Sequence, residues 1–327
     1  MQLGAWHGSI GRRGFLGLVL AGMVALGLPS GAAAGEGPLK VVATTGMIAD
    51  AARVVGGDQV TVRALMGPGV DPHSYRQTRT DILALAKADM VLWHGLYLEA
   101  QMEEFLLELG RSERVVAVAE TLPPDRLIAH DVYTEKFDPH VWMDPTLWTG
   151  VVATVRDALI AARPADEAAF RRNAEAHIRE IEALADYAKR VTASVPDGSR
   201  VLVTAHDAFN YFGAAFGFEV VGIQGISTAS EAGLKRISDL AAMLAERRIA
   251  AVFVESSVSD RNIRALIEGA AAKGHEVRIG GELYSDAMGV PGTYEGTYIG
   301  MIDHNVTTIA RALGGDVPAR GMSGLLN

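Results

Sequence analysis

The sequence predicts an α/β protein in which two parallel-sheet lobes are joined by a single long helix. Two observations predict this fold class. Short apolar and β-branched segments alternate with amphipathic segments in both halves of the chain, an order typical of parallel βαβ units. Between the halves, residues 165–194 show one long helical pattern, with apolar side chains spaced by three, four and seven residues. We therefore expect an N-terminal lobe at 35–164, a linking helix at 165–194 and a C-terminal lobe at 195–327.

The first half alternates predicted strands with predicted helices. Short segments rich in Val and Leu predict strands at 39–45, 60–65, 90–93 and 115–118. Helices are expected between and after them, at 47–55, 81–88, 96–109 and 145–162. Pro164 ends the last of these helices. Such an order favours a parallel sheet covered by helices on its faces.

The second half repeats this alternation after Pro196-Asp197-Gly198, a turn sequence that ends the long helix. Strands are expected at 200–204, 220–223, 251–255 and 276–279. Helices are expected at 209–216, 234–247, 263–273 and 302–313. Ligands bind at the carboxyl ends of the strands in open parallel sheets. Two such lobes could therefore place a binding site in the cleft between them.

Residues 1–34 have the pattern of an export signal. Arg12 and Arg13 precede an apolar run from Leu18 to Leu28, and three alanines follow at 32–34. The apolar run is shorter than a membrane-spanning helix requires. The arginine pair also resembles a twin-arginine signal, so both the general and the twin-arginine export routes stay open. We expect a signal peptide and an exported, periplasmic protein.

Charge and cysteine content narrow the function classes. The formal net charge is −9, whereas a nucleic-acid-binding protein needs a basic face, so we expect no nucleic-acid partner. The acidic balance suits a protein that meets cations, but solubility alone explains it equally well. The sequence has no cysteine, which excludes disulfides, thiolate metal sites and lipid attachment through cysteine. We expect a soluble exported protein that is not lipid-anchored through cysteine.

The tripeptide Asp-Pro-His occurs twice, ending at His73 and at His140. Proline fixes its own φ and biases the preceding residue towards an extended conformation, so each histidine stands on a rigid loop. The preceding aspartate is a candidate acceptor for the ring N–H, a partner that orients histidine ligands in metal sites. A pair of polar turns is the alternative interpretation.

Two further candidates follow strands in the second half. His206 comes directly after a predicted strand, and Asp286 lies beyond the last one. Their alternatives are a structural histidine and a helix or turn cap. Three imidazoles and one carboxylate complete a four-coordinate or slightly larger metal shell. The spacings of 67, 66 and 80 residues are too long for a local site, and they suit a site assembled between lobes.

Several segments resemble a known family, the TroA-like periplasmic zinc- and manganese-binding receptors of ABC importers. The matching stretches are 66–73, 138–144, 204–209, 225–231, 254–257 and 282–289. The resemblance implies two lobes joined by one long helix, with the metal between them. It implies His73, His140, His206 and Asp286 as ligands of one Zn²⁺ or Mn²⁺ per chain. It also implies the membrane permease of a metal ABC importer as partner, and a monomer.

The resemblance also sets expectations about variation within the family. Members carry histidine or glutamate as the third ligand, and this chain has histidine. Some zinc receptors carry a long His-rich loop before the second ligand. Here the segment 127–137 is short, with only His130 and Asp131 as candidate metal-gathering residues.

A transport receptor that is not an enzyme is the favoured function. Zinc is the favoured metal because imidazole-rich shells suit it, and manganese comes next. The alternatives are a periplasmic metallohydrolase and a metal-dependent adhesin. Neither a His-Glu-x-x-His sequence nor a Gly-x-Ser-x-Gly elbow is present, which disfavours the hydrolase.

The remaining histidines and tryptophans receive structural interpretations. His177 is expected on a solvated face of the long helix. His94, His275 and His304 are expected to make structural hydrogen bonds. Glu231 and Glu255 are candidates for hydrogen bonding in the cleft. The tryptophans are expected in the core, at 93, 142 and 148.

Overall fold

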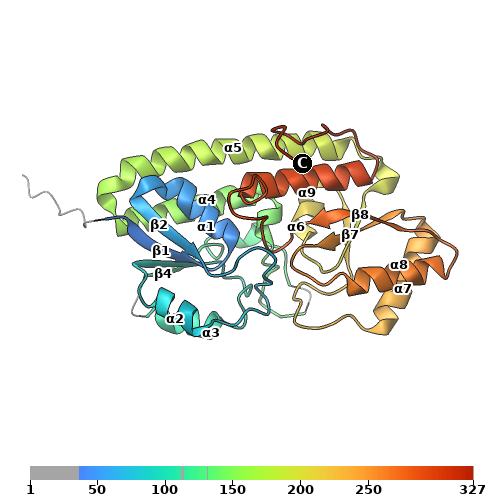
Figure 1. Ribbon diagram of the computed structural model, residues 1–327, viewed down its shortest axis with the longest axis horizontal. Helices are drawn as coiled ribbons and strands as arrows, with labels where there is room; N and C mark the ends of the chain where they lie inside the picture. The colour runs from blue at the N-terminus through green and yellow to red at the C-terminus, as the bar shows by residue number, and fades with distance from the viewer. Residues whose placement is uncertain (1–36, 112–113, 131, 327) are drawn as a thin grey trace, which may run out of the picture. The chain divides into compact units, whose positions relative to one another are not determined.

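The computed structural model describes residues 37–111, 114–130 and 132–326 (Figure 1). Within this part of the chain, the first lobe is a four-stranded parallel sheet in the order β2-β1-β3-β4. Its strands are β1 (Leu39–Ala43), β2 (Val60–Ala64), β3 (Met90–Trp93) and β4 (Val115–Ala117). Its helices are α1 (Gly46–Gly56), α2 (Arg79–Leu85), α3 (Glu103–Leu109) and α4 (Pro145–Ala162). The predicted signal peptide lies outside the described residues and stays a prediction.

In the second lobe the described strands form two parallel pairs, β5-β6 and β7-β8, with β5 next to β7. These strands are β5 (Val201–Thr204), β6 (Glu219–Gly222), β7 (Ala251–Glu255) and β8 (Arg278–Leu283). The helices are α6 (Asn210–Phe216), α7 (Leu234–Arg247), α8 (Arg261–Ala271) and α9 (Tyr298–Ala312). The predicted α/β class with parallel sheets in two lobes is confirmed.

The long helix α5 (Glu167–Ala193) lies along both lobes, with α9 beside it (Figure 1). It contacts α1 and α4 of the first lobe and α6 and α9 of the second. Its 27 residues correspond to roughly 40 Å at about 1.5 Å per residue. A three-residue 3₁₀ turn at Pro164–Asp166 precedes it, so the helix begins two residues later than predicted.

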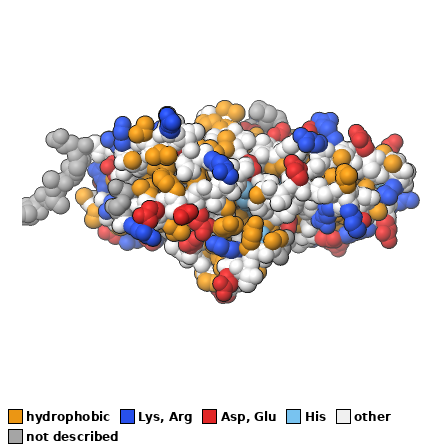
Figure 2. All heavy atoms as spheres, turned by 90° about the horizontal axis from the view of Figure 1, so that it is seen from below, with side chains coloured by type: hydrophobic (Ala, Val, Ile, Leu, Met, Phe, Trp, Pro, Cys, Tyr) orange, Lys and Arg blue, Asp and Glu red, His pale blue; other side chains and the backbone are white. Residues whose placement is uncertain are grey.

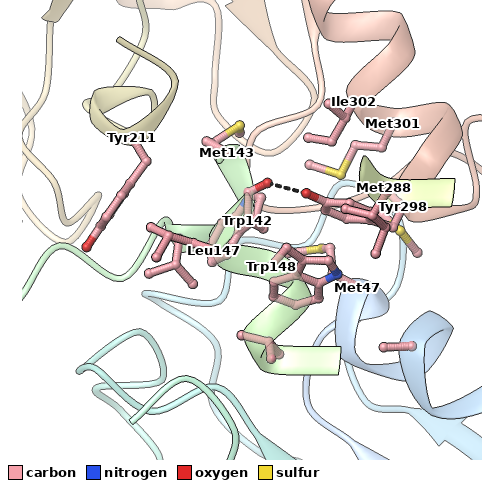
Figure 3. Packing of buried hydrophobic residues seen from close by; sticks show 14 of the residues in the cluster. Met47, Trp142, Met143, Leu147, Trp148, Tyr211, Met288, Tyr298, Met301 and Ile302 are labelled. Atoms are coloured by element: carbon pink, nitrogen blue, oxygen red, sulfur yellow. Dashed lines mark hydrogen bonds between the residues drawn. The ribbon is translucent and has the colours of Figure 1, made fainter. Parts of the chain in front are cut away.

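One continuous apolar core joins the two lobes. Met47 of α1 and Trp148 of α4 belong to the same buried cluster as Met288 and Tyr298 of the second half (Figure 3). The rings of Trp148 and Tyr298 are stacked, with centroids 5.2 Å apart. The predicted core positions of the tryptophans are confirmed, since Trp93, Trp142 and Trp148 are all buried. A wide hinge motion between the lobes would have to break this packing.

The helix predicted at 96–109 begins only at Glu103. Leu96 and Tyr97 have φ angles of 52° and 68°, which a right-handed helix cannot contain. The buried carboxylate of Glu99 accepts the backbone N–H groups of His94 and Gly95 at 2.8 and 3.2 Å. Because this side chain satisfies the backbone, the segment folds as a turn instead of a first helical turn.

Two boundaries near the end of the chain were also wrong. β8 was expected at 276–279 but runs from Arg278 through two glycines to Leu283, with a register shift opposite β7. A Cβ on Gly280 would lie 2.7 Å from the ring of Phe253, so glycine is needed for this close approach. α9 begins at Tyr298 and not at Ile302, because Thr297 caps it by accepting the backbone N–H of Gly300.

His177 is buried, with 3% of its surface exposed, which contradicts the prediction of a solvated face. α5 packs against helices of both lobes, so the buried stripe runs through Ala174, His177 and Ile181. The stripe therefore includes a polar position at helical spacing. Nδ1 of His177 lies 3.3 Å from a carboxylate oxygen of Glu180 one turn along the helix.

On the face seen in Figure 2, basic and acidic side chains are intermingled, and neither forms a separate charged patch. Among the described residues, no helix is both long enough and apolar enough to cross a membrane.

Candidate metal centre

The four side chains predicted as metal ligands come together in one buried cluster, at His73, His140, His206 and Asp286. Each offers one ligand atom, and these atoms lie within 4.8 Å of one another. Two come from the first lobe and two from the second. His73 follows β2 and His206 follows β5, while Asp286 lies three residues beyond β8. Loops that follow strands thus supply three of the four, as expected for ligand sites in parallel sheets.

The geometry leaves a position for a cation between the ligand atoms. Nε2 of His73 and Nε2 of His140 face each other at 3.2 Å. Asp286 places Oδ1 3.4 Å from Nε2 of His140 and Oδ2 3.3 Å from Nε2 of His206. Within the described residues, Nε2 of His206 and Oδ1 of Asp286 are buried without a hydrogen-bond partner. Buried polar atoms are costly when unpaired, and a shared metal ion would satisfy all four side chains at once.

Burial and charge set the protonation of the cluster. Burial lowers the pKa of His73 to about 3, although Asp286 opposes the shift. Burial also disfavours protonated His140, but the nearby Asp138 and Asp286 outweigh it and raise the pKa of His140 to about 9. Burial likewise disfavours protonated His206, but the nearby Asp286 and Glu255 outweigh it and raise the pKa of His206. Binding a cation here therefore means displacing protons from imidazole.

Carboxylates orient two of the three rings. Asp138 Oδ1 lies 2.7 Å from Nδ1 of His140 and also accepts its backbone N–H at 2.9 Å. Glu255 Oε2 lies 2.5 Å from Nδ1 of His206, and Oε1 accepts the backbone N–H of that residue at 2.9 Å. Such partners fix the tautomer and direct Nε2 of each ring at the cluster. The predicted contact between Asp138 and the ring of His140 is confirmed, and so is the predicted hydrogen bonding by Glu255 in the cleft.

The expectation for Asp71 was wrong. Its Oδ1 accepts the backbone N–H of His73 at 2.9 Å, and its Oδ2 accepts the hydroxyls of Ser74 and Thr228 at 2.8 and 2.6 Å. The ring of His73 is not among its partners in the described structure. Asp71 is held by a hydroxyl of the second lobe, which draws the carboxylate away from the imidazole.

The loop around His140 is tied to the second lobe by side chains that sequence analysis missed. Asn210 donates to Asp138 Oδ2 at 3.0 Å, and Tyr211 donates to the Asp138 carbonyl at 2.9 Å. Trp142 Nε1 donates to the carbonyl of Ser285, the neighbour of Asp286, at 2.8 Å. These partners lie between 72 and 143 residues away in sequence, so no local sequence pattern indicates them.

Other histidines make the structural contacts that were predicted. Nε2 of His94 lies 2.7 Å from the carbonyl of Pro139, which supports the His140 loop. His275 and His304 place Nε2 2.7 and 2.9 Å from the carbonyls of Ile249 and Glu282. His130 lies in the short loop before the candidate ligand His140, and its Nδ1 accepts two backbone N–H groups. Asp131 lies outside the described residues.

Comparison with known proteins agrees with this architecture. The manganese-binding lipoprotein MntA of Bacillus subtilis is 47% identical over 305 residues, covering 92% of this chain and 99% of its own. The iron-binding protein YfeA of Yersinia pestis is 30% identical, with coverage of 84% and 86%. The solved structure of the periplasmic zinc-binding protein TroA of Treponema pallidum superposes with a TM-score of 0.82 at 46% identity. It matches 85% of this chain and 99% of that chain.

The family model described as ZnuA, the periplasmic component A of the zinc-uptake complex, matches residues 41–312. This range contains the long helix and all four clustered side chains. The chain therefore belongs to the ZnuA family, the metal-binding periplasmic substrate-binding proteins of ABC transporters.

Proposed function

We propose that the protein captures one divalent transition metal ion with His73, His140, His206 and Asp286 and delivers it to the membrane permease of an ABC importer. The observation that carries this proposal is the convergence of three Nε2 atoms and one carboxylate from two lobes within 4.8 Å. Four protein ligands fill a tetrahedral shell. A catalytic metal site would keep an open position for water or substrate, so the donor set favours a carrier over a metallohydrolase.

Zinc is the proposed cargo, with manganese second. Three imidazoles and one carboxylate suit Zn²⁺, whereas Mn²⁺ favours a shell richer in oxygen. Relatives are named for both metals, so the family alone does not choose between them. The two carboxylate oxygens of Asp286 bear on the choice between zinc and manganese. If both bound the ion, the carboxylate would add a fifth ligand atom and make the site more favourable for manganese.

The setting of the protein follows from the same proposal. Export to the periplasm would place it where an importer collects its cargo, and the leader-like sequence at 1–34 supports this. We propose a soluble protein there, since the sequence contains no cysteine to carry a lipid, and a monomer, as the resemblance to the TroA-like receptors implies.

Metal analysis with a matched pair of histidine variants tests the function. The protein is stripped with a chelator and titrated with zinc and manganese in competition with a chromophoric chelator. We expect one tightly held ion per chain, with zinc preferred. His140→Ala should abolish tight binding, because it removes a ligand and leaves Asp138 without its partner. His275→Ala should bind as the wild type does, because Nε2 of that ring lies 2.7 Å from the carbonyl of Ile249, before the start of β7, whereas the candidate ligands lie beyond the ends of the strands. A wild type without stoichiometric metal would refute the proposal.

A further inference from the structure

A polar cavity of about 160 Å³ lies beside residues that support two of the candidate ligands. It is lined by Asp71 of the first lobe and by polar residues of the second, among them Gln224, Thr228 and Ser257. Asp71 stands two residues before His73. Ser257 donates to Asp286 Oδ2 at 3.2 Å. The cavity thus touches the direct supports of one candidate ligand from each lobe.

A hydrogen bond between the lobes crosses at this cavity. The hydroxyl of Thr228 donates to Oδ2 of Asp71 at 2.6 Å, between residues 157 positions apart in sequence. The other oxygen of the same carboxylate holds the backbone N–H of His73 at 2.9 Å. Hydrogen bonds from a hydroxyl to a carboxylate are short and about twice as strong as neutral ones. Thr228 therefore fixes, from the opposite lobe, the group that holds the backbone of a ligand.

The loop before His73 approaches the second lobe at another point. Gly69 has a φ of +70°, and a Cβ there would lie 3.3 Å from the carbonyl oxygen of Ser256. The close approach and the left-handed conformation both favour glycine. The segment between Gly69 and His73 thus rests on the second lobe through a backbone contact and a side-chain hydrogen bond, without the buried aromatic packing that surrounds Trp142.

A second, smaller cavity has Asp286 itself in its lining, but most of its other lining residues are apolar. Its volume is about 60 Å³, and its lining includes Met66, Pro68 and Met288. A divalent cation that leaves its ligands must regain water and polar contacts, and an apolar passage offers neither. The cavity beside Thr228 offers a departing cation polar contacts from Asp71, Gln224 and Glu231, and Arg261 also lines it.

We propose that Thr228 is a positioning residue that keeps His73 in the metal shell and controls the rate at which the bound ion leaves through the polar cavity. The inference rests on the proposed function and adds a residue that governs release. Opening of the Thr228–Asp71 hydrogen bond frees Asp71 and the backbone of His73, so this imidazole leaves the ion first. His140, His206 and Asp286 keep their own supports during this step.

Release kinetics of Thr228 variants test the inference. Zinc-loaded protein is mixed in a stopped-flow instrument with excess chromophoric chelator, and the rate of zinc release is recorded. Thr228→Val keeps the branched shape and removes the hydroxyl, so release should accelerate by about tenfold, the value of one hydrogen bond to a charged group. Thr228→Ser keeps the hydroxyl and should stay close to the wild type.

A second threonine separates this role from a loss of stability. Thr307 in α9 donates to buried Asp303 at 3.0 Å, remote from the ligand loops. Thr307→Val should lower the unfolding midpoint of the metal-free protein and leave zinc release unchanged. Equal release rates for wild type and Thr228→Val would overturn the inference, as would equal acceleration by Thr307→Val. A wild type that binds no zinc would overturn the proposed function and this inference together, so the two failures are distinguishable.

Discussion

The loop of His73 and the loop of His140 share the tripeptide Asp-Pro-His and are held in different ways. Asp138 is fully buried and contacts both the backbone and the ring of His140. Asp71 is partly exposed and contacts only the backbone of His73. A carboxylate therefore orients the ring of one candidate ligand, His140, whereas a carboxylate positions only the main chain of the other, His73.

The second lobe also holds the two loops differently. Asn210 and Tyr211 bind Asp138 at its carboxylate and its carbonyl, and the bond to the carbonyl is buried. Trp142, in the turn that follows His140, is buried and binds next to Asp286. Asp71 is met from the second lobe by the partly exposed hydroxyl of Thr228. The His140 loop thus has more buried contacts with the second lobe than the His73 loop has, and in our proposal the His73 loop is the part that opens.

Replacing each aspartate by asparagine should separate the two roles most strongly. Asp138→Asn removes the charge that orients the ring of His140 and turns an amide N–H towards the Asn210 donor. We expect zinc affinity to fall by roughly 10–100-fold, the usual cost of losing such a partner. Asp71→Asn should lower equilibrium affinity less, because no ring loses its partner. Competitive titration of both variants measures the difference.

Unfolding of the two metal-free proteins serves as the control for that comparison. A loss of zinc affinity by Asp71→Asn as large as that by Asp138→Asn would show that the loops are equivalent, contrary to their surroundings. The same conclusion would follow if the two variants lost affinity only in proportion to their lost stability.

Removing one support of the His140 loop should affect stability more than release. Tyr211 donates to the Asp138 carbonyl and accepts the backbone N–H of Ile128 at 3.0 Å. Tyr211→Phe leaves both partners unpaired, so the free energy of unfolding should fall by about 2 kcal/mol. Zinc release should stay near the wild-type rate, because Asn210 and His94 still hold the loop. Denaturant unfolding and stopped-flow measurement of zinc release check the two effects. Faster zinc release with unchanged stability would contradict the proposed difference between the His140 loop and the His73 loop.

Much of the fold and all four clustered side chains could be predicted from local sequence. Alternating strands and helices, the long amphipathic segment and the two Asp-Pro-His tripeptides are patterns within short windows. His206 and Asp286 were identified because they follow strands, and the sheets bring such positions together. For α5 and β5, whose patterns lie within one continuous stretch of sequence, the predicted bounds were close to the observed ones.

Contacts between distant segments explain what sequence missed. The different partners of Asp71 and Asp138 depend on Thr228 and Asn210, which lie 157 and 72 residues away. His177 stands on a buried stripe because α5 packs against both lobes, and a single-helix pattern does not show this. The turn at 96–102 forms because buried Glu99 binds the backbone, a choice that helical spacing alone cannot reveal.

Anomalous diffraction from zinc-loaded crystals, recorded at the zinc absorption edge, tests the metal site most directly. The structure predicts one strong peak between the lobes, about 2.0–2.1 Å from Nε2 of His73, His140 and His206 and about 2.0–2.2 Å from a carboxylate oxygen of Asp286. A peak at any other place, or a zinc ion held there without one of these four side chains, would contradict the account.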